Sequence, residues 1–345
     1  MLNISRKCKM PFPGIIGQTA VKKRLGEALT GQPGHAYVFT GPRGIGRRSL
    51  AMLFAQGLLC EQPDEDGPCF NCTACHHFQN QVHPDFRRLS LEKKEKNIKV
   101  ERVRHQISAD MSMQPQFGNR KVYLIPVDDL NEQGQNALLK SLEEPPPYVC
   151  FLLTVEQLDR LLPTIRSRVV PLIMQRLNRE EITAILREKQ AGDPAAWPFY
   201  ASFSGGIPGV AVDFAGSEWF GSLRQECLDL YDSLGQAGRA RLLTSGFDFF
   251  ERNREQTSLL LDLLGSLIRD QMVCLTGGAD LTNSDQLDLL KRQPVYRLSS
   301  EQARVRLDRA YLAILSAQRG LTANASFELL VCQLLLTLRK ELIHA

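Results

Sequence analysis

The sequence predicts an α/β domain with a parallel sheet of the phosphate-loop type, followed by a small helical lid and an all-α C-terminal domain. Residues 36–40 form an apolar run that precedes a glycine-rich turn and an apolar helical pattern, the order that makes a phosphate-loop match credible. Further short β-rich runs alternate with helical segments, and the strand signals cease after Met174. Alternating strands and helices indicate a parallel sheet that is covered on both faces.

The elements follow in chain order. After the first strand, a helix is expected over 49–59, and further strands over 85–91, 121–127, 149–155 and 168–174. Between the third and fourth strands, "EQGQNALLKSLEEPPP" predicts a helix that ends at its prolines. Asn178 and Glu181 then form a capping-box pattern for the first lid helix, with Gly192 as its stop. These patterns divide the chain into an α/β domain (1–175), a lid (176–212) and a helical domain (213–345).

Composition indicates an ordinary folded protein. The chain has 345 residues, of which 43% are hydrophobic and 23% charged, and its formal net charge is +4. That charge is too small to identify a nucleic-acid-binding protein by itself. The start "MLNISRKCKM" contains no apolar signal region, and the most apolar helical stretch is interrupted by Asp262. We therefore expect a cytoplasmic protein that neither is secreted nor spans a membrane.

The glycine-rich turn "GPRGIGRRSL" departs from the phosphate-loop motif G-x-x-x-x-G-K-[ST] at its end. It keeps the glycines that let backbone N–H groups face an anion, so phosphate binding stays open. Arginines replace the phosphate-binding lysine and the Mg²⁺-binding hydroxyl, and the serine comes one position late, about 100° further round the helix. The positions are Gly41, Gly44, Gly46, Arg47, Arg48 and Ser49. The sequence therefore predicts a degenerate nucleotide site in which Mg²⁺ lacks its hydroxyl ligand.

Four cysteines cluster in the segment 60–75, with the spacing C-x8-C-x2-C-x2-C. They are Cys60, Cys69, Cys72 and Cys75. Four thiolates hold zinc tetrahedrally and leave no open coordination position, so the spacing predicts a structural zinc ion. The alternatives are thiols without a ligand role, disulfides, or substitution of one ligand by His76 or His77.

Taken together, the turn, the cysteine module, "NALLKSLEEPP" and "LLPTIRSR" resemble the bacterial DNA polymerase III clamp loader subunits of the AAA+ class, over about residues 12–210. The resemblance implies that the helical C-terminal domain is a collar that holds five subunits together. It implies as partners the gamma/tau and delta subunits, the sliding clamp and primed DNA, and no membrane. Within the family, the gamma/tau type hydrolyses ATP and the delta prime type is commonly inactive.

The resemblance also locates further losses. In the family, the strand corresponding to "KVYLIPVDDL" ends in carboxylates that support Mg²⁺ and orient water, whereas this chain has Pro126 and Val127. Asp128 and Asp129 follow two residues later, about 6.6 Å along a strand, and are interpreted as a polar turn that caps the next helix near Asn131. The resemblance also places a phosphate-sensing arginine near Gly209, and this chain has none there.

One element of the family's catalytic apparatus is retained. Ser167 and Arg168 match the Ser-Arg-Cys motif, with Val169 in place of the cysteine. The resemblance implies that Arg168 enters the ATP site of a neighbouring subunit as an arginine finger in trans; otherwise it is a surface arginine. A chain that loses its own site but keeps what it donates is predicted to be a non-hydrolysing stator of the delta prime type.

Two other functions remain open. The chain could be a gamma/tau-like ATPase whose site is rebuilt from Arg47, Ser49 and Asp128. It could instead bind nucleic acid through its zinc module, with Arg87, Arg88 and the lysines of 93–99, although few aromatic residues accompany those charges.

Overall fold

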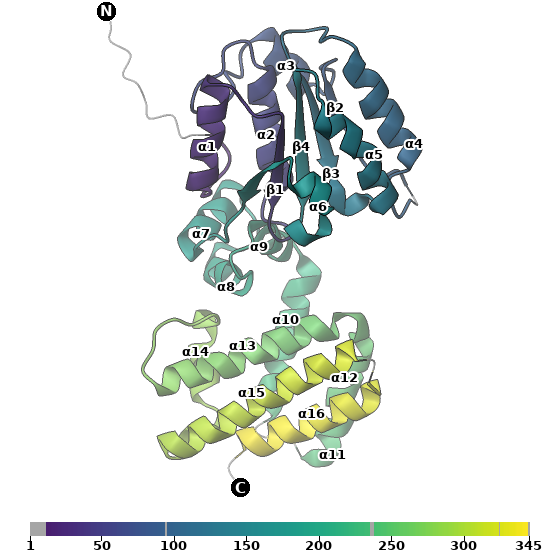
Figure 1. The fold of residues 1–345 in the computed structure, drawn as a ribbon. Coiled ribbons are helices and arrows are strands. Elements are labelled where there is room, and N and C mark those ends of the chain that lie inside the picture. The colour runs from purple at the N-terminus through teal and green to yellow at the C-terminus, as the bar shows by residue number, and fades with distance from the viewer. Residues whose placement is uncertain (1–11, 94, 235–237, 324, 344–345) are drawn as a thin grey trace, which may run out of the picture. The chain divides into compact units, whose positions relative to one another are not determined.

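The computed structural model describes residues 12–93, 95–234, 238–323 and 325–343 (Figure 1). The chain forms two compact units, which we describe separately. The first unit runs to Leu177 and also contains Ile207–Gly209. The second unit contains Asn178–Gly206 and the chain from Val210 onward. The predicted division into three domains stays a prediction.

The first unit is built on a five-stranded parallel sheet with the order β2-β3-β4-β1-β5. All five predicted strands are present, and the edge strands are shorter than predicted. Their bounds are β1 Ala36–Thr40, β2 Phe86–Arg88, β3 Lys121–Pro126, β4 Val149–Val155 and β5 Val170–Ile173. The central strands β1 and β4 are almost wholly buried, which explains why they read as continuous apolar runs. The predicted α/β fold with a parallel sheet is confirmed.

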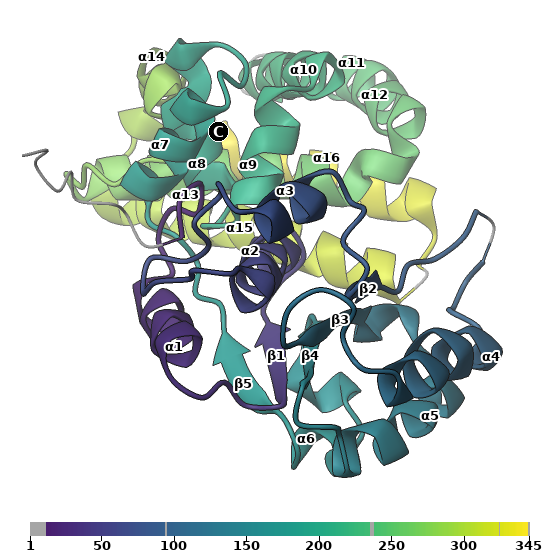
Figure 2. The same ribbon diagram turned by 90° about the horizontal axis from the view of Figure 1, so that it is seen from above.

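Helices cover both faces of this sheet (Figure 2). On one face, Tyr37 and Phe39 of β1 pack with residues of α1, α2 and α3. On the other face, Ala36 and Val38 of the same strand pack with residues of α4, α5 and α6. Successive side chains of a strand alternate between faces, so β1 contributes to both cores. The helices are α1 Thr19–Thr30, α2 Arg47–Leu59, α3 Thr73–Gln79, α4 Val100–Val103, α5 Glu132–Glu143 and α6 Pro163–Arg166.

The predicted helix starts and stops are set by capping residues. The Asn131 side chain accepts a hydrogen bond from the Gly134 N–H at the start of α5, and this helix ends at Glu143, before the prolines. Asn178 and Glu181 form the predicted capping box at the start of α7. That helix ends at Glu188, four residues before Gly192, which has a positive φ of 62°.

The second unit is helical in its described residues. Its helices are α7 Arg179–Glu188, α8 Trp197–Phe203, α9 Pro208–Ala215 (which starts in the first unit), α10 Glu218–Leu234, α11 Arg239–Arg241, α12 Phe247–Arg252, α13 Thr257–Leu275, α14 Leu287–Lys291, α15 Ser300–Thr322 and α16 Phe327–Leu342. The Arg224 guanidinium of α10 lies 3.5 Å from the centroid of the Phe199 ring of α8 and pairs with Asp285. Within the described residues, no helix combines the length and apolar character that crossing a membrane requires.

A buried carboxylate organises the connection that follows α13. Asp270 is fully buried. Its two oxygens accept hydrogen bonds from the backbone N–H groups of Thr282 (3.0 Å) and Asn283 (2.6 Å). The Asn283 side chain adds a third bond at 2.9 Å, and Arg269 lies 3.1 Å away. A charge buried this deeply is tolerated because its oxygens are hydrogen-bonded and paired.

Candidate functional site

The glycine turn between β1 and α2 has the backbone conformation that its glycines permit. Gly41, Gly44 and Gly46 have φ values of 151°, 85° and 100°, a region that residues with a Cβ atom rarely enter. Gly46 precedes the first residue of α2, so the helix begins at Arg47, two residues earlier than predicted. The turn therefore still ends at a helix N-terminus, where backbone N–H groups lack partners within the helix.

A segment from much later in the chain packs directly on this turn. The Gly209 N–H donates a hydrogen bond to the Gly44 carbonyl oxygen at 2.9 Å. A Cβ atom on Gly209 would lie 2.8 Å from both the Cα and the carbonyl oxygen of Gly44. Real Cβ atoms essentially never come so close to backbone. A side chain at position 209 would therefore require the backbones of residues 209 and 44 to move apart.

Arg47 is directed to carboxylates of its own chain. Its Nη1 lies 3.0 Å from Asp128 Oδ2 and its Nη2 lies 3.7 Å from Glu156 Oε1, with 12% of the side chain exposed. Asp128 also accepts the Glu156 N–H at 2.9 Å and pairs with Arg160 at 3.2 Å. The network links α2 to the chain after β3 and after β4. The cation at the lysine position is thus already neutralised within the chain.

The predicted polar turn is present at Val127–Asp129, but the prediction that one of its aspartates caps α5 was wrong. Asn131 caps α5, whereas Asp128 lies in a short turn and binds Arg47 and the Glu156 backbone. Asp128 and Arg47 are 81 positions apart in the chain, and the tertiary structure brings them together. Burial, and then the neighbouring charge of Asp128, raises the pKa of Asp129. The alternative of a rebuilt nucleotide site groups Arg47 with Asp128, and the structure shows that these two side chains pair with each other.

The two positions at which the resemblance implies carboxylates, 126 and 127, carry apolar side chains. Pro126 is the last residue of β3. Val127 is 1% exposed and belongs to the apolar core on the α5 side of the sheet. Arg48 and Ser49 are exposed at the start of α2. The structure therefore brings Arg47 and Asp128 together, and leaves Ser49 outside that network.

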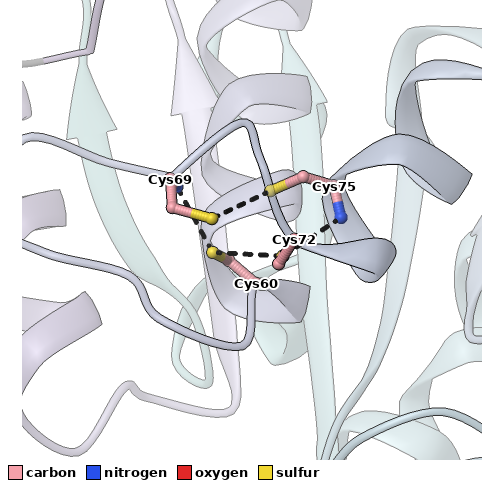
Figure 3. A group of neighbouring side chains, drawn as sticks. All are labelled: Cys60, Cys69, Cys72 and Cys75. Carbon is pink, nitrogen blue, oxygen red and sulfur yellow. Dashed lines mark hydrogen bonds between the residues drawn. The ribbon is translucent and has the colours of Figure 1, made fainter.

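The four predicted cysteines lie together, between the end of α2 and the start of α3 (Figure 3). Their sulfur atoms all lie within 4.8 Å of one another. The Cys60–Cys72 and Cys69–Cys75 sulfur separations are 3.9 Å and 4.0 Å. A tetrahedral site with metal–sulfur bonds of about 2.3 Å places its sulfurs about 3.8 Å apart. The cluster therefore fits a tetrahedral metal ion, and its sulfurs are too far apart for disulfides, whose S–S bond is about 2.05 Å.

The surroundings of the cluster distinguish its thiols. Burial raises the pKa of Cys60 to about 11. Burial acts in the same direction on Cys69, but hydrogen bonds from the backbone of Asn71 and Cys72 lower its pKa to about 7. Among the described residues, this cluster consists of the four cysteines alone and includes neither His76 nor His77. A set of four thiolates leaves no open position, so any bound ion would be structural.

Arg168 lies just beyond α6 and is 35% exposed. Its Nη1 donates to the carbonyl oxygen of Thr164 at 2.7 Å and to the Ser167 hydroxyl at 3.2 Å. Its Nη2 lies 3.0 Å from Glu143 Oε1, at the end of α5. Val169, the residue after it, is buried in the core on the α5 side of the sheet. A buried neighbour and three acceptors thus hold an accessible guanidinium in place.

The basic residues of the nucleic-acid alternative are partly neutralised within the chain. Arg87 lies 3.7 Å from Asp110, and Lys99 lies 3.6 Å from Glu95. Position 94 lies outside the described residues. The remaining charges include Arg88, whose pKa is lowered by burial and by the nearby charge of Arg48. No aromatic stacking platform was predicted here, and the ion pairs further weaken this alternative.

Comparison with known proteins supports a single family. Residues 17–178 match the family model described as DNA polymerase III, delta subunit. A DNA polymerase III subunit delta' of Pseudomonas aeruginosa is 44% identical over 154 residues, which are 44% of this chain and 46% of that protein. A DNA polymerase III subunit tau of Escherichia coli is 30% identical over 305 residues, or 82% of this chain and 47% of that protein.

A third relative extends the similarity along most of both chains. The DNA polymerase III subunit delta' of Bacillus subtilis is 28% identical over 314 residues, covering 89% of this chain and 91% of its own. The matches to the P. aeruginosa and E. coli proteins each span about half the length of those relatives. Together with the parallel sheet and the glycine turn, these matches support a DNA polymerase III clamp loader subunit.

Proposed function

We propose that this chain is a delta prime-type subunit of a DNA polymerase III clamp loader, a stator that does not hydrolyse ATP. It would supply Arg168 to the ATP site of an adjacent gamma/tau-type subunit and help load the sliding clamp on primed DNA. Its other partners would be the delta-type subunit and, through the helical collar of residues 213–345, the rest of the complex. A cytoplasmic location follows from that role.

The contrast in exposure between Arg47 and Arg168 carries the proposal. Arg47 is turned to Asp128 and Glu156, and apolar Val127 occupies a family carboxylate position. Phosphoryl transfer depends almost entirely on positioned cations, Mg²⁺ and an oriented water, so these changes remove the chemistry from the chain's own site. Arg168 also pairs with a carboxylate, that of Glu143, but 35% of its side chain is exposed against 12% for Arg47. An accessible arginine can stabilise charge on a γ-phosphate in a neighbouring subunit.

We further propose that Cys60, Cys69, Cys72 and Cys75 hold one structural zinc ion. The sulfur separations of 3.9 Å and 4.0 Å support this, as does the donor set of four thiolates. When bound, zinc would supply folding free energy and no Lewis-acid chemistry, because all four of its positions would be filled by protein. The cluster lies between the end of α2 and the start of α3, so the ion would cross-link these two helix ends through the segment 60–75.

The alternative is a gamma/tau-like ATPase with a rearranged site, which the match to the tau subunit favours. It requires Arg47 and Asp128 to exchange their mutual ion pair for a nucleotide and Mg²⁺. Magnesium-dependent ATP hydrolysis by the purified chain distinguishes the two functions. We expect no turnover above a blank without protein, and turnover that disappears in an Asp128→Asn variant would establish the alternative.

The arginine finger is tested in a reconstituted complex with a gamma/tau-type ATPase and the delta-type subunit. We expect Arg168→Ala to remove the single-turnover hydrolysis of one ATP site and to leave complex assembly intact. Removing a finger lowers the rate at its site by about 10³-fold or more. Arg166→Ala is the matched control, because Arg166 lies two residues away and forms an ion pair with exposed Asp159 at 3.1 Å. Equal hydrolysis by the Arg168→Ala and parent complexes would remove the finger from the proposal.

A further inference from the structure

We infer that Glu143 is a positioning residue for Arg168, an inference that rests on the proposed arginine finger. Glu143 Oε1 lies 3.0 Å from Arg168 Nη2, and the two side chains are 48% and 35% exposed. Neither carboxylate nor guanidinium is deeply buried, so the pair has little value for the stability of the fold. The ion pair matters instead because it restricts the orientation of the Arg168 guanidinium.

The two terminal nitrogens of Arg168 are held from two different elements. The Thr164 carbonyl oxygen and the Ser167 hydroxyl accept hydrogen bonds from Nη1, at 2.7 Å and 3.2 Å. Both acceptors belong to α6 or to the residue just after it, so they fix the guanidinium relative to its own backbone. Glu143 binds Nη2 from the end of α5, which precedes β4 in the chain. Opposed partners on Nη1 and Nη2 fix the plane of the guanidinium.

Both supporting elements are anchored in the core on the same face of the sheet. Leu142, the neighbour of Glu143, is 1% exposed, and Ile165 of α6 is fully buried. The carboxylate is therefore presented by a rigid helix end. An arginine side chain loses considerable rotamer entropy when its guanidinium is fixed in one position. Because the ion pair with Glu143 fixes Arg168 before a neighbouring subunit docks, less of that entropy is lost at the catalytic step.

Positioning of this kind acts on catalysis more than on substrate binding. An arginine finger stabilises charge that develops in the transition state, so misorienting it lowers kcat and leaves KM for ATP nearly unchanged. Small misplacements of a catalytic group have large effects on rate. For loss of one exposed ion pair, we expect kcat at the affected site to fall about fivefold, which corresponds to about 1 kcal/mol. The finger itself remains, so the loss is far smaller than for Arg168→Ala.

The test uses the reconstituted complex and single-turnover ATP hydrolysis at the affected site. We expect Glu143→Ala to lower the single-turnover rate constant at saturating ATP about fivefold, with the ATP concentration for half of the maximal rate unchanged. Glu143→Gln, which keeps an acceptor oxygen, should have a smaller effect. Glu144→Gln is the matched control, because Glu144 is the exposed neighbour of Glu143 and its substitution removes one negative charge at the same helix end. Complex assembly, measured by size-exclusion chromatography, should be the same for all variants.

A double-mutant cycle separates positioning from a general structural role. If Glu143 acts through Arg168, Glu143→Ala has no further effect in an Arg168→Ala background. Equal losses of rate in the two backgrounds would overturn the inference, as would a rate increase in Glu143→Ala alone. If Arg168→Ala has no effect, the proposed finger fails. If Arg168→Ala lowers the rate and the Glu143 variants do not, only the positioning role fails.

Discussion

Replacement of Gly209 by alanine should destabilise the first unit, although alanine is the better helix former. Gly209 is the second residue of α9, and its φ lies outside the left-handed region, so the backbone itself accepts alanine. The obstacle is space. The new Cβ atom would stand 2.8 Å from the Cα and carbonyl oxygen of Gly44, where the 2.9 Å hydrogen bond from Gly209 already fixes the separation.

Two opposing effects set the magnitude. A glycine-to-alanine change in a helix is favourable by up to about 1 kcal/mol. Forcing one extra methyl group against fixed atoms costs about 1–3 kcal/mol. The clashing atoms belong to the backbone of Gly44 and not to the end of a flexible side chain, so only a backbone shift can relieve the contact. Overpacking therefore wins, and we expect a net loss of about 1–2 kcal/mol in the free energy of unfolding.

The measurement is urea unfolding followed by circular dichroism, combined with hydrogen–deuterium exchange of residues 41–50. We expect a lower midpoint and faster exchange of the glycine turn in Gly209→Ala. Gly221→Ala is the control, because a Cβ atom at Gly221 in α10 meets nothing within 4 Å and should stabilise the helix by about 0.5–1 kcal/mol. Equal stability of Gly209→Ala and parent, with unchanged exchange in the turn, would refute the close packing of residues 209 and 44.

Two further changes test the metal cluster and the core of the second unit. Elemental mass spectrometry of the purified chain should find one zinc ion per molecule. The Cys75→Ser variant should lose this ion, whereas Cys332→Ser, which lies outside the cluster, should retain it. A parent protein free of zinc would count against the site. Asp270→Ala should lower the free energy of unfolding by about 3 kcal/mol, because it leaves the buried N–H groups of Thr282 and Asn283 without an acceptor. Asp280→Ala, at an exposed ion pair, should change it by under about 1 kcal/mol in the same denaturation assay.

Local sequence signals determined the secondary structure and the parts of the site that are close together in the chain. The buried runs at 36–40 and 149–155 became β1 and β4 with the predicted bounds. The capping box at Asn178 formed as predicted, because its hydrogen bonds join residues three positions apart. The cysteine cluster could be predicted for the same reason, since C-x2-C spacing brings two sulfurs together within one turn.

Short sequence patterns do not specify which side chains of distant segments contact each other. Arg47 and Asp128 are 81 positions apart in the chain, and the packing of α2 against neighbouring strands makes them an ion pair. The pairing of Glu143 with Arg168 likewise depends on α5 and α6 lying on one face of the sheet. Side-chain direction and register decide such pairs, and neither is encoded in a short motif.

The sequence by itself determined that the lysine, the hydroxyl and the carboxylates of an ATPase are absent from this chain, because those are questions of residue identity. Only the tertiary structure decided the contacts of the residues that are present: Arg47 is neutralised by Asp128 and Glu156, and Gly209 is packed against Gly44. The physical reason is that charge pairing and steric exclusion act across a few ångströms of space, whatever the separation along the chain.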